Sequence, residues 1–156
     1  MLLVKNKKAS YDYQLEDKYT AGIVLSGAEV KSLRLQHASL AGSYIKALQG
    51  NHNKLELFLI NAQINPYKFA GRNDDYDPKR SRKLLLKRKE IEELAIASEQ
   101  KGRSIVPLAF ILDHNQIKLE LAIAKGKKTF EKRETIKKRD LQREFSKKMK
   151  RQQLKF

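Results

Sequence analysis

The sequence contains no cysteine and no tryptophan, and it has only 3 prolines among its 156 residues. Without cysteine, disulfides, thiolate zinc sites and thiol nucleophiles are all excluded. No apolar run approaches the roughly 20 residues that are needed to cross a bilayer. The first residues show no long apolar stretch behind a basic flank, so we expect no secretory signal and a cytoplasmic protein.

Acidic residues are also scarce relative to basic ones. Lysine and arginine number 34 against 18 acids, which gives a net charge of +16. Residues 125–156 alone hold 14 basic and 4 acidic residues, a net charge of +10. This excess predicts an acidic partner, nucleic acid in preference to an anionic membrane. The length and the 40% apolar content suit one domain with one modest core.

The basic C-terminal segment has a narrow apolar stripe. Leu141, Phe145 and Met149 recur at the i, i+4 and i+8 positions of a helix. Such a stripe buries little, and the surrounding like charges repel one another. We therefore predict a tail at 129–156 that is disordered alone and helical when bound, following a domain at 1–128. The alternative is an ordinary solvated surface helix.

A second basic cluster runs from Lys79 to Lys89 without an acidic residue. Three aspartates precede it, Asp74, Asp75 and Asp77. They have neither the EF-hand pattern nor a spaced partner carboxylate. The sequence therefore predicts a loop here and no metal site.

Hydrophobic periodicity indicates a β-rich body. Strands are predicted at 11–25, 43–48, 54–60, 105–112 and 116–124, and helices at 29–35 and 88–100. In the last strand apolar residues alternate strictly, which points Lys118 outward. Pro107 within the preceding strand indicates an edge or a bulge. Short strands in this number suit a small closed or partly closed barrel with about two helices.

No catalytic constellation is recognisable. His37, His52 and His114 are isolated, and no metalloprotease or nucleophile-elbow motif occurs. The segment 124–128 lacks the leading glycine and the following Ser or Thr of a phosphate-binding loop. We expect a binding protein rather than an enzyme, without a cofactor. An enzyme acting on RNA and a membrane-binding protein with an amphipathic tail are the less favoured classes.

Three blocks of the sequence stand out beyond their composition. They are AGIVLSGAEVKSLR at 21–34, DPKRSRKLLL at 77–86, and AKGKK at 124–128 followed by EKR at 131–133. Together they resemble the small protein B family, the SsrA-binding proteins of bacteria. The blocks occur in that family's order, and the basic tail extends the resemblance from about Asn6 to Met149.

The resemblance implies an OB-like barrel and a C-terminal tail. Members of that family bind the tRNA-like domain of tmRNA, the hybrid transfer-messenger RNA, and deliver it to stalled ribosomes. The tail is then expected in the decoding centre and the empty mRNA channel, where it senses the missing message. The expected partners are tmRNA and the ribosome, with no membrane and no small-molecule substrate, and the protein is expected to be a monomer. A generic ribosomal or single-strand RNA-binding protein is the alternative.

The resemblance also assigns residues to the two partners. RNA contacts are implied for Asn6, Lys7, Lys8, Glu29, Lys31, Arg34, Arg80, Arg82, Lys83, Leu85, Lys118, Lys125, Gly126, Lys127 and Lys128. Tail contacts with the ribosome are implied for Phe130, Glu131, Lys132, Arg133, Ile136, Lys137 and Arg139. We expect Arg80, Arg82 and Lys83 at the surface. Two alternatives stay open, core packing for Leu85 and a structural salt bridge for Glu29.

The chain departs from the family's pattern at several positions. Thr20 replaces an acid and Ser10 an arginine, while Phe130 stands where many members have histidine. A phenylalanine keeps a face for stacking on a base but loses charge and hydrogen bonds. Leu141 replaces a tryptophan of the tail, and Lys87 replaces an asparagine that would cap a helix for about 1 kcal/mol.

Overall fold

The computed structural model describes residues 1–71, 75–127 and 129–153, with the backbone alone at 129–131 and 152–153. The strands are β1 (Leu2–Lys5), β2 (Tyr13–Ile23), β3 (Ala38–Ser39), β4 (Tyr44–Gln49), β5 (Leu55–Ile60), β6 (Gln63–Ile64), β7 (Arg82–Leu85), β8 (Arg103–Asp113) and β9 (Gln116–Gly126). The helices are α1 (Ala9–Asp12), α2 (Gly27–Arg34), α3 (Arg88–Glu99) and α4 (Thr129–Gln153), with a 3-10 turn at Asn51–Asn53.

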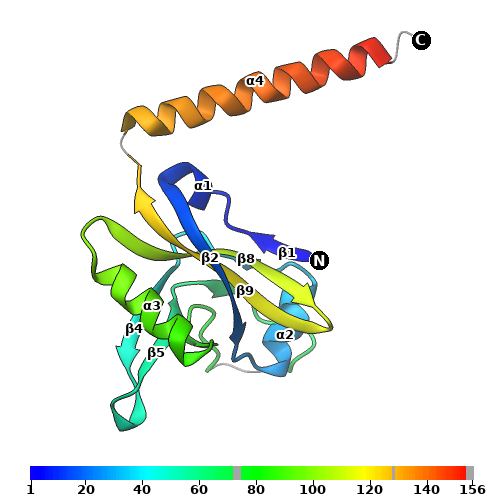
Figure 1. Ribbon diagram of the computed structural model, residues 1–156. Helices are drawn as coiled ribbons and strands as arrows, with labels where there is room; N and C mark the ends of the chain where they lie inside the picture. The colour runs from blue at the N-terminus through cyan, green and yellow to red at the C-terminus, as the bar shows by residue number, and fades with distance from the viewer. Residues whose placement is uncertain (72–74, 128, 154–156) are drawn as a thin grey trace.

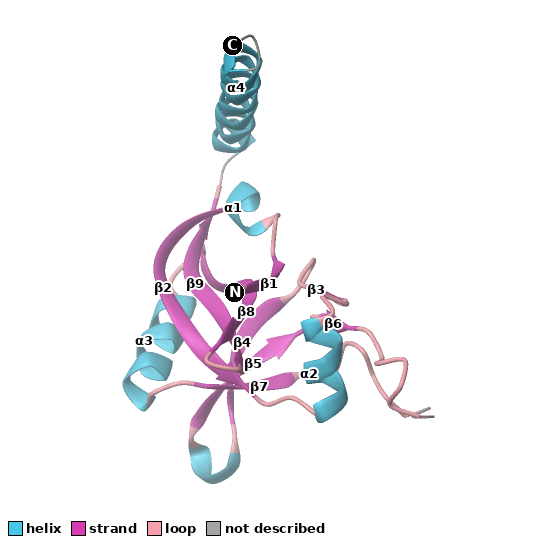
Figure 2. Ribbon diagram, turned by 90° about the vertical axis from the view of Figure 1, so that its right-hand side faces the viewer, coloured by secondary structure: helices cyan, strands magenta, loops and turns pink. Residues whose placement is uncertain are grey.

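The main sheet closes into a barrel. Its strands follow the order β1-β8-β4-β5-β7-β2-β9, and β8 also pairs with β9. All of these pairings are antiparallel. Closure leaves few unpaired edges, with β1 added beside β8 and α2 and α3 on opposite sides of the barrel (Figure 1, Figure 2). The β-rich, OB-like fold predicted from the sequence is confirmed.

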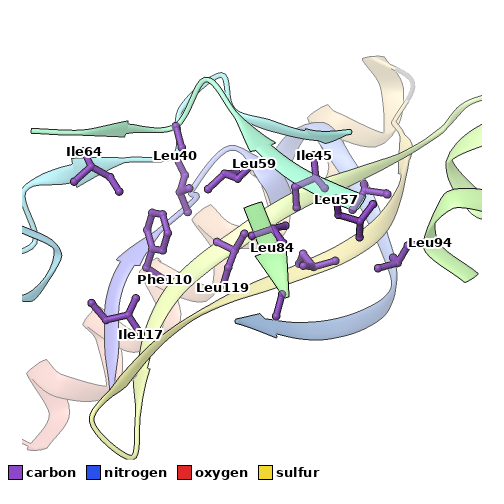
Figure 3. Packing of buried hydrophobic residues seen from close by; sticks show 14 of the residues in the cluster. Leu40, Ile45, Leu57, Leu59, Ile64, Leu84, Leu94, Phe110, Ile117 and Leu119 are labelled. Atoms are coloured by element: carbon purple, nitrogen blue, oxygen red, sulfur yellow. The ribbon is translucent and has the colours of Figure 1, made fainter. Parts of the chain in front are cut away.

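Leucines from facing strands fill the barrel. Leu57 of β5, Leu84 of β7 and Leu119 of β9 point into the same interior, beside Phe110 of β8 (Figure 3). Each of the four is at most 1% exposed. Burying one such side chain contributes about 1.5–3 kcal/mol, so this cluster supplies much of the driving force for closure.

The β8–β9 hairpin follows the sequence prediction closely. Its two-residue turn is His114 and Asn115, whose φ angles of 48° and 63° are those of a type I′ turn. The register shifts between Pro107 and Ala109, so Pro107 lies at a bulge as predicted. The apolar alternation of β9 likewise places its buried residues on the barrel interior.

Two of the helices are the ones predicted for the body. A capping box begins α2, because the Ser26 hydroxyl accepts from Glu29 N–H and the Glu29 carboxylate accepts from Ser26 N–H. At the start of α3 the Lys87 side chain makes no cap, and only Glu90 bonds back to the Lys87 N–H, 3.3 Å away. The strand predicted from residue 11 begins instead at Tyr13, because residues 9–12 form the short helix α1.

The basic tail is a single helix. The 25 residues of α4 extend beyond the barrel, above α1 (Figure 1, Figure 2). The helical form of the tail is therefore the one that the structure shows, while its predicted disorder in isolation stays a prediction. In the described part of the chain, no helix combines the length and the apolar character needed to cross a membrane.

Candidate nucleic-acid interface

A buried ion pair joins the second of the three blocks, residues 77–86, to helix α2. Arg82, on β7, is 0% exposed, and its Nε lies 2.6 Å from Oε2 of Glu29, which is 1% exposed on α2. Nη1 of Arg82 donates to the carbonyl oxygens of Ala62 and Arg80, at 2.8 and 3.1 Å. Nη2 lies 3.1 Å from the carbonyl oxygen of Pro78 and 2.5 Å from Glu29 Oε2. Acceptors therefore surround the whole guanidinium.

Two further side chains complete this centre. Arg80, about one-third exposed, donates to Oε1 of Glu29. The hydroxyl of Tyr76 donates a hydrogen bond to the carbonyl oxygen of Ile64 over 2.8 Å and accepts one from Arg82 Nη2 over 3.3 Å. The centre thus joins α2, the segment before β7, and β7 itself.

Burial and charge in this centre shift the pKa values of Glu29 and Tyr76. Burial alone would raise the pKa of Glu29, but hydrogen bonds from Arg80 and the Ser26 N–H, with the charge of Arg82, outweigh it. The net effect holds the pKa of Glu29 below its ordinary value of 4.5. Burial, followed by the negative charge of Glu29, raises the pKa of Tyr76. Glu29 is therefore held ionised at neutral pH, where it balances the buried arginine.

This geometry corrects one expectation and decides one alternative. The prediction that Arg82 lies at the surface is wrong, because strand alternation turns Arg82 and Leu84 inward and Lys83 and Leu85 outward. Glu29 makes the structural salt bridge that the sequence left open as an alternative. Both side chains are enclosed by the protein, so they hold the shape of this face rather than present groups on it.

The outward side of β7 does present such groups. Leu85 is 52% exposed, so it does not pack in the core. Lys83 is 44% exposed and its Nζ lies 3.1 Å from Oε1 of Glu56. Both border a groove of about 400 Å³ between β5, β7 and α3, where Lys54 and Arg88 add positive charge. Glu56 and Glu92 line the same groove, and Nε of Arg88 lies 3.4 Å from Oε1 of Glu92, so Leu85 lies among both basic and acidic side chains.

Lys118 lies where the alternation of β9 placed it. Its side chain is one-third exposed between the buried Ile117 and Leu119, and its Nζ is 3.1 Å from Oδ2 of Asp113. Hydrogen bonds from Lys118 and His114 lower the pKa of Asp113. The ammonium group is thus held near the tip of the β8–β9 hairpin, and its side chain stays partly exposed.

Of the other barrel residues predicted to contact RNA, some are exposed to solvent and one is hydrogen-bonded within the protein. Lys31 and Arg34, on α2, and Lys7 and Lys8, before α1, are exposed. Asn6 is half-buried, and its Nδ2 donates over 2.8 Å to the carbonyl oxygen of Pro107, which ties β1 to β8. Asn6 therefore supports the fold at a position that the sequence assigned to RNA.

The third signature block connects the barrel to the tail. Lys125 and Gly126 are exposed at the end of β9. Lys127 is engaged, since its Nζ lies 2.9 Å from the carbonyl oxygen of Ser10 and 2.8 Å from Oγ1 of Thr135. Lys128 lies outside the described residues.

Helix α1 receives the first turns of α4. Lys132 Nζ lies 3.4 Å from Oδ1 of Asp12 and 5.8 Å from the ring centroid of Tyr11. Arg139 Nη2 lies 2.5 Å from Oγ of Ser10. Cations of the tail thus contact α1, and sequence reasoning missed α1 because four residues give no periodic signal.

Beyond these contacts α4 is open to solvent. Leu141 and Phe145 are 65% and 66% exposed, and Met149 shares their stripe. Ile136 is 41% exposed, and Arg133 and Lys137 are exposed as well. For Phe130 and Glu131 the backbone is helical and their side chains lie outside the description.

Over the residues described, no cluster of three potential metal-binding side chains occurs, and the aspartates at 75 and 77 are not part of one.

The sequence profile of a known family, described as SmpB protein, matches residues 3–151. The chain belongs to the SmpB family.

Its similarity to individual SmpB relatives covers nearly the whole chain. An SsrA-binding protein of Lactobacillus delbrueckii subsp. bulgaricus is 45% identical over 147 residues, covering 94% of this chain and 92% of the relative. One from Caldicellulosiruptor saccharolyticus is 47% identical over 149 residues, covering 96% and 90%. A solved structure, described as tmRNA–SmpB on a journey to the centre of the bacterial ribosome, is also similar. Its TM-score is 0.66 and its sequence identity is 38%, and the match covers 83% of this chain and 87% of the other.

The profile match includes each of the three SmpB-like blocks. Their structural roles nevertheless differ. The block at 21–34 provides the buried acid, the block at 77–86 provides its arginines together with an exposed leucine, and the block at 124–128 leads from the barrel to α4. Tyr76 completes the buried centre and was missed, since nothing in the sequence pairs a lone tyrosine with Glu29.

Proposed function

We propose that this protein binds the tRNA-like domain of tmRNA and delivers it to ribosomes stalled without a stop codon. The observation that carries the proposal is the similarity, over more than nine-tenths of the chain, to proteins named for binding SsrA RNA. The structural likeness to SmpB with tmRNA in the bacterial ribosome supports the second partner. The role is one of binding rather than catalysis, by a cytoplasmic monomer without a cofactor.

The barrel, residues 1–128, is the proposed tmRNA-binding domain. Its exposed cations would neutralise phosphates, and Leu85 would add an apolar contact beside them. The proposed contacts are Lys7, Lys8, Lys31, Arg34, Lys83, Leu85, Lys118, Lys125, Gly126 and Lys128. Asn6, Glu29, Arg80, Arg82 and Lys127 bond within the protein, and their proposed role is to position this surface.

The tail, residues 129–156, is the proposed ribosome-binding part. A helix with net positive charge suits a channel lined by RNA, which α4 would occupy when no message fills it. The proposed contacts with the decoding centre and channel are Phe130, Glu131, Lys132, Arg133, Ile136, Lys137 and Arg139. Lys132 and Arg139 contact Asp12 and Ser10 in this structure. On the ribosome, these two cations would leave those partners and contact ribosomal RNA instead.

A gel-shift titration with three RNAs at two salt concentrations tests the function. The probes are tmRNA, a tRNA and a random single strand of similar length. We expect tmRNA to bind most tightly, and to keep its advantage at the higher salt concentration, where non-specific phosphate contacts weaken. Equal affinity for the three RNAs would instead indicate a generic single-strand RNA-binding protein.

A further inference from the structure

The segment at 65–71, between β6 and β7, carries two aromatic side chains that the signature blocks do not include. Phe69 is 77% exposed, while Tyr67 is half-buried beside it. Their ring centroids are 5.6 Å apart with the planes at 67°. Because the rings meet edge to face, neither covers the other in a parallel stack. This segment, called here the aromatic loop, projects from the body beside α2 (Figure 2).

Cations accompany both rings. Lys31 Nζ, from α2, lies 5.5 Å from the centroid of Tyr67, and Lys68 Nζ lies 5.8 Å from that of Phe69. Arg34 follows Lys31 by one helical turn and is also exposed. Glu29, the nearest acid of α2, is buried and balanced by two arginines. The exposed charge that α2 presents beside the aromatic loop is therefore positive.

A small hollow adjoins the ring of Tyr67. Its volume is about 100 Å³, and Ser26, Asn65 and Tyr67 are among the residues that line it. Such groups can accept and donate hydrogen bonds at the edge of a planar ligand. An exposed aromatic face, adjacent cations and a recess with polar groups in its lining together match what an unpaired nucleotide needs for its base, phosphate and base edge.

We propose that the aromatic loop is a stacking platform for one unpaired RNA base, with Phe69 against the base and Lys68 and Lys31 near its phosphates. This inference rests on the proposed function, because the partner is RNA. Its site is distinct from the phosphate contacts proposed on β7 and β9. Phe69 buries little surface in the body, so removing its ring would leave the fold intact and affect the platform alone.

The test uses the full chain and a single-stranded RNA of about 10 nucleotides, within the usual site size, carrying 2-aminopurine. Stacking on Phe69 should quench the fluorescence of that base on binding. Phe69→Ala should abolish the quenching and weaken affinity by on the order of tenfold, as loss of one stacked base does. Phe69→Tyr should restore both, and Phe69→Leu, apolar without a π face, should not.

Ile96→Ala is the matched control, since Ile96 is an exposed apolar residue on α3 and is 63% exposed. It should leave quenching and affinity unchanged. Circular dichroism of every variant should match that of the original chain. If Phe69→Ala binds and quenches like the original chain, or if Phe69→Leu rescues it, the platform is refuted. The tmRNA titration of the original chain is a separate readout, so failure of tmRNA binding would count against the proposed function and not against the platform.

Discussion

At the scale of single residues, the decisive feature is a buried arginine at a strand position where an apolar side chain would be expected. Arg82 precedes Leu84 by two on β7, so it points into the protein, and it is tolerated there because Glu29 meets it from α2. Sequence periodicity marks apolar residues as buried and charged ones as exposed. It therefore placed Arg82 at the surface, and it could not pair two residues that are 53 positions apart.

Arg82→Lys should destabilise the protein strongly. A lysine cannot reproduce the forked donor set, so the Glu29 carboxylate and the carbonyl of Ala62 would lose buried partners. Each buried group left without its hydrogen-bond partner costs about 1–3 kcal/mol. Urea unfolding should show this loss, whereas Lys83→Met, at the adjacent outward position, should change the free energy of unfolding by less than about 1 kcal/mol. Equal losses in the two variants would contradict the assignment.

Glu29→Gln should alter how stability depends on pH. Because the pKa of Glu29 is lowered on folding, its charge stabilises the protein above the ordinary value of 4.5, and this contribution is lost as pH falls through the lowered pKa. The free energy difference between Glu29→Gln and the original chain should therefore be largest near neutrality and shrink below pH 4.5. Unfolding curves at several pH values measure it, with Asp17→Asn as the exposed-acid control. A difference independent of pH would contradict the account.

At the scale of elements, the strands were predictable where one face alone is buried. The alternation of β9 gave both its buried set and the outward side of Lys118, and Pro107 gave the bulge. The three leucines after Lys83 could not be divided in this way, since a uniform apolar run carries no alternation. Helix α1 was missed because Tyr11 and Tyr13 also fit the period of a strand.

The attachment of α4 depends on α1, which the isolated tail lacks. A peptide of residues 131–156 has lost Ser10 and Asp12 as partners, keeps an unbalanced positive charge, and has a thin apolar stripe. Isolated helices of this kind are marginal in water. Circular dichroism should therefore show little helix in buffer and more with a helix-promoting solvent or with ribosomes. A fully helical peptide in buffer would exclude folding on binding.

At the scale of the whole molecule, positive charge is spread over several faces of one closed barrel. Lys83 and Lys118 lie on β7 and β9, and Lys125 lies where the barrel meets the tail. The sequence identified Lys83 and Lys125 through its blocks, and Lys118 through the alternation of β9 and the family resemblance. Their separation into exposed contacts and buried supports had to come from the fold, because it depends on which strand face each occupies.

Replacing Lys83 and Lys118 together by alanine should weaken tmRNA binding and reduce its salt dependence. If both contact phosphates, the slope of log affinity against log salt should fall by about 1.5. The fold should survive, because both side chains are partly exposed and their ion pairs lie at the surface. The charge-matched control replaces the exposed Lys46 and Lys101 and should leave the slope nearly unchanged. An equal fall in both double variants would show that only overall charge matters.

The central claim is that the barrel binds tmRNA and the tail acts on the ribosome. The most direct test is the affinity for tmRNA of a chain that lacks residues 131–156, compared with the full chain. The buried centre, β7, β9 and Lys125 remain in the shortened chain. We predict an affinity within about tenfold of the full chain, equivalent to at most 1.4 kcal/mol, together with loss of ribosome rescue. A larger loss of tmRNA affinity would contradict this division between barrel and tail.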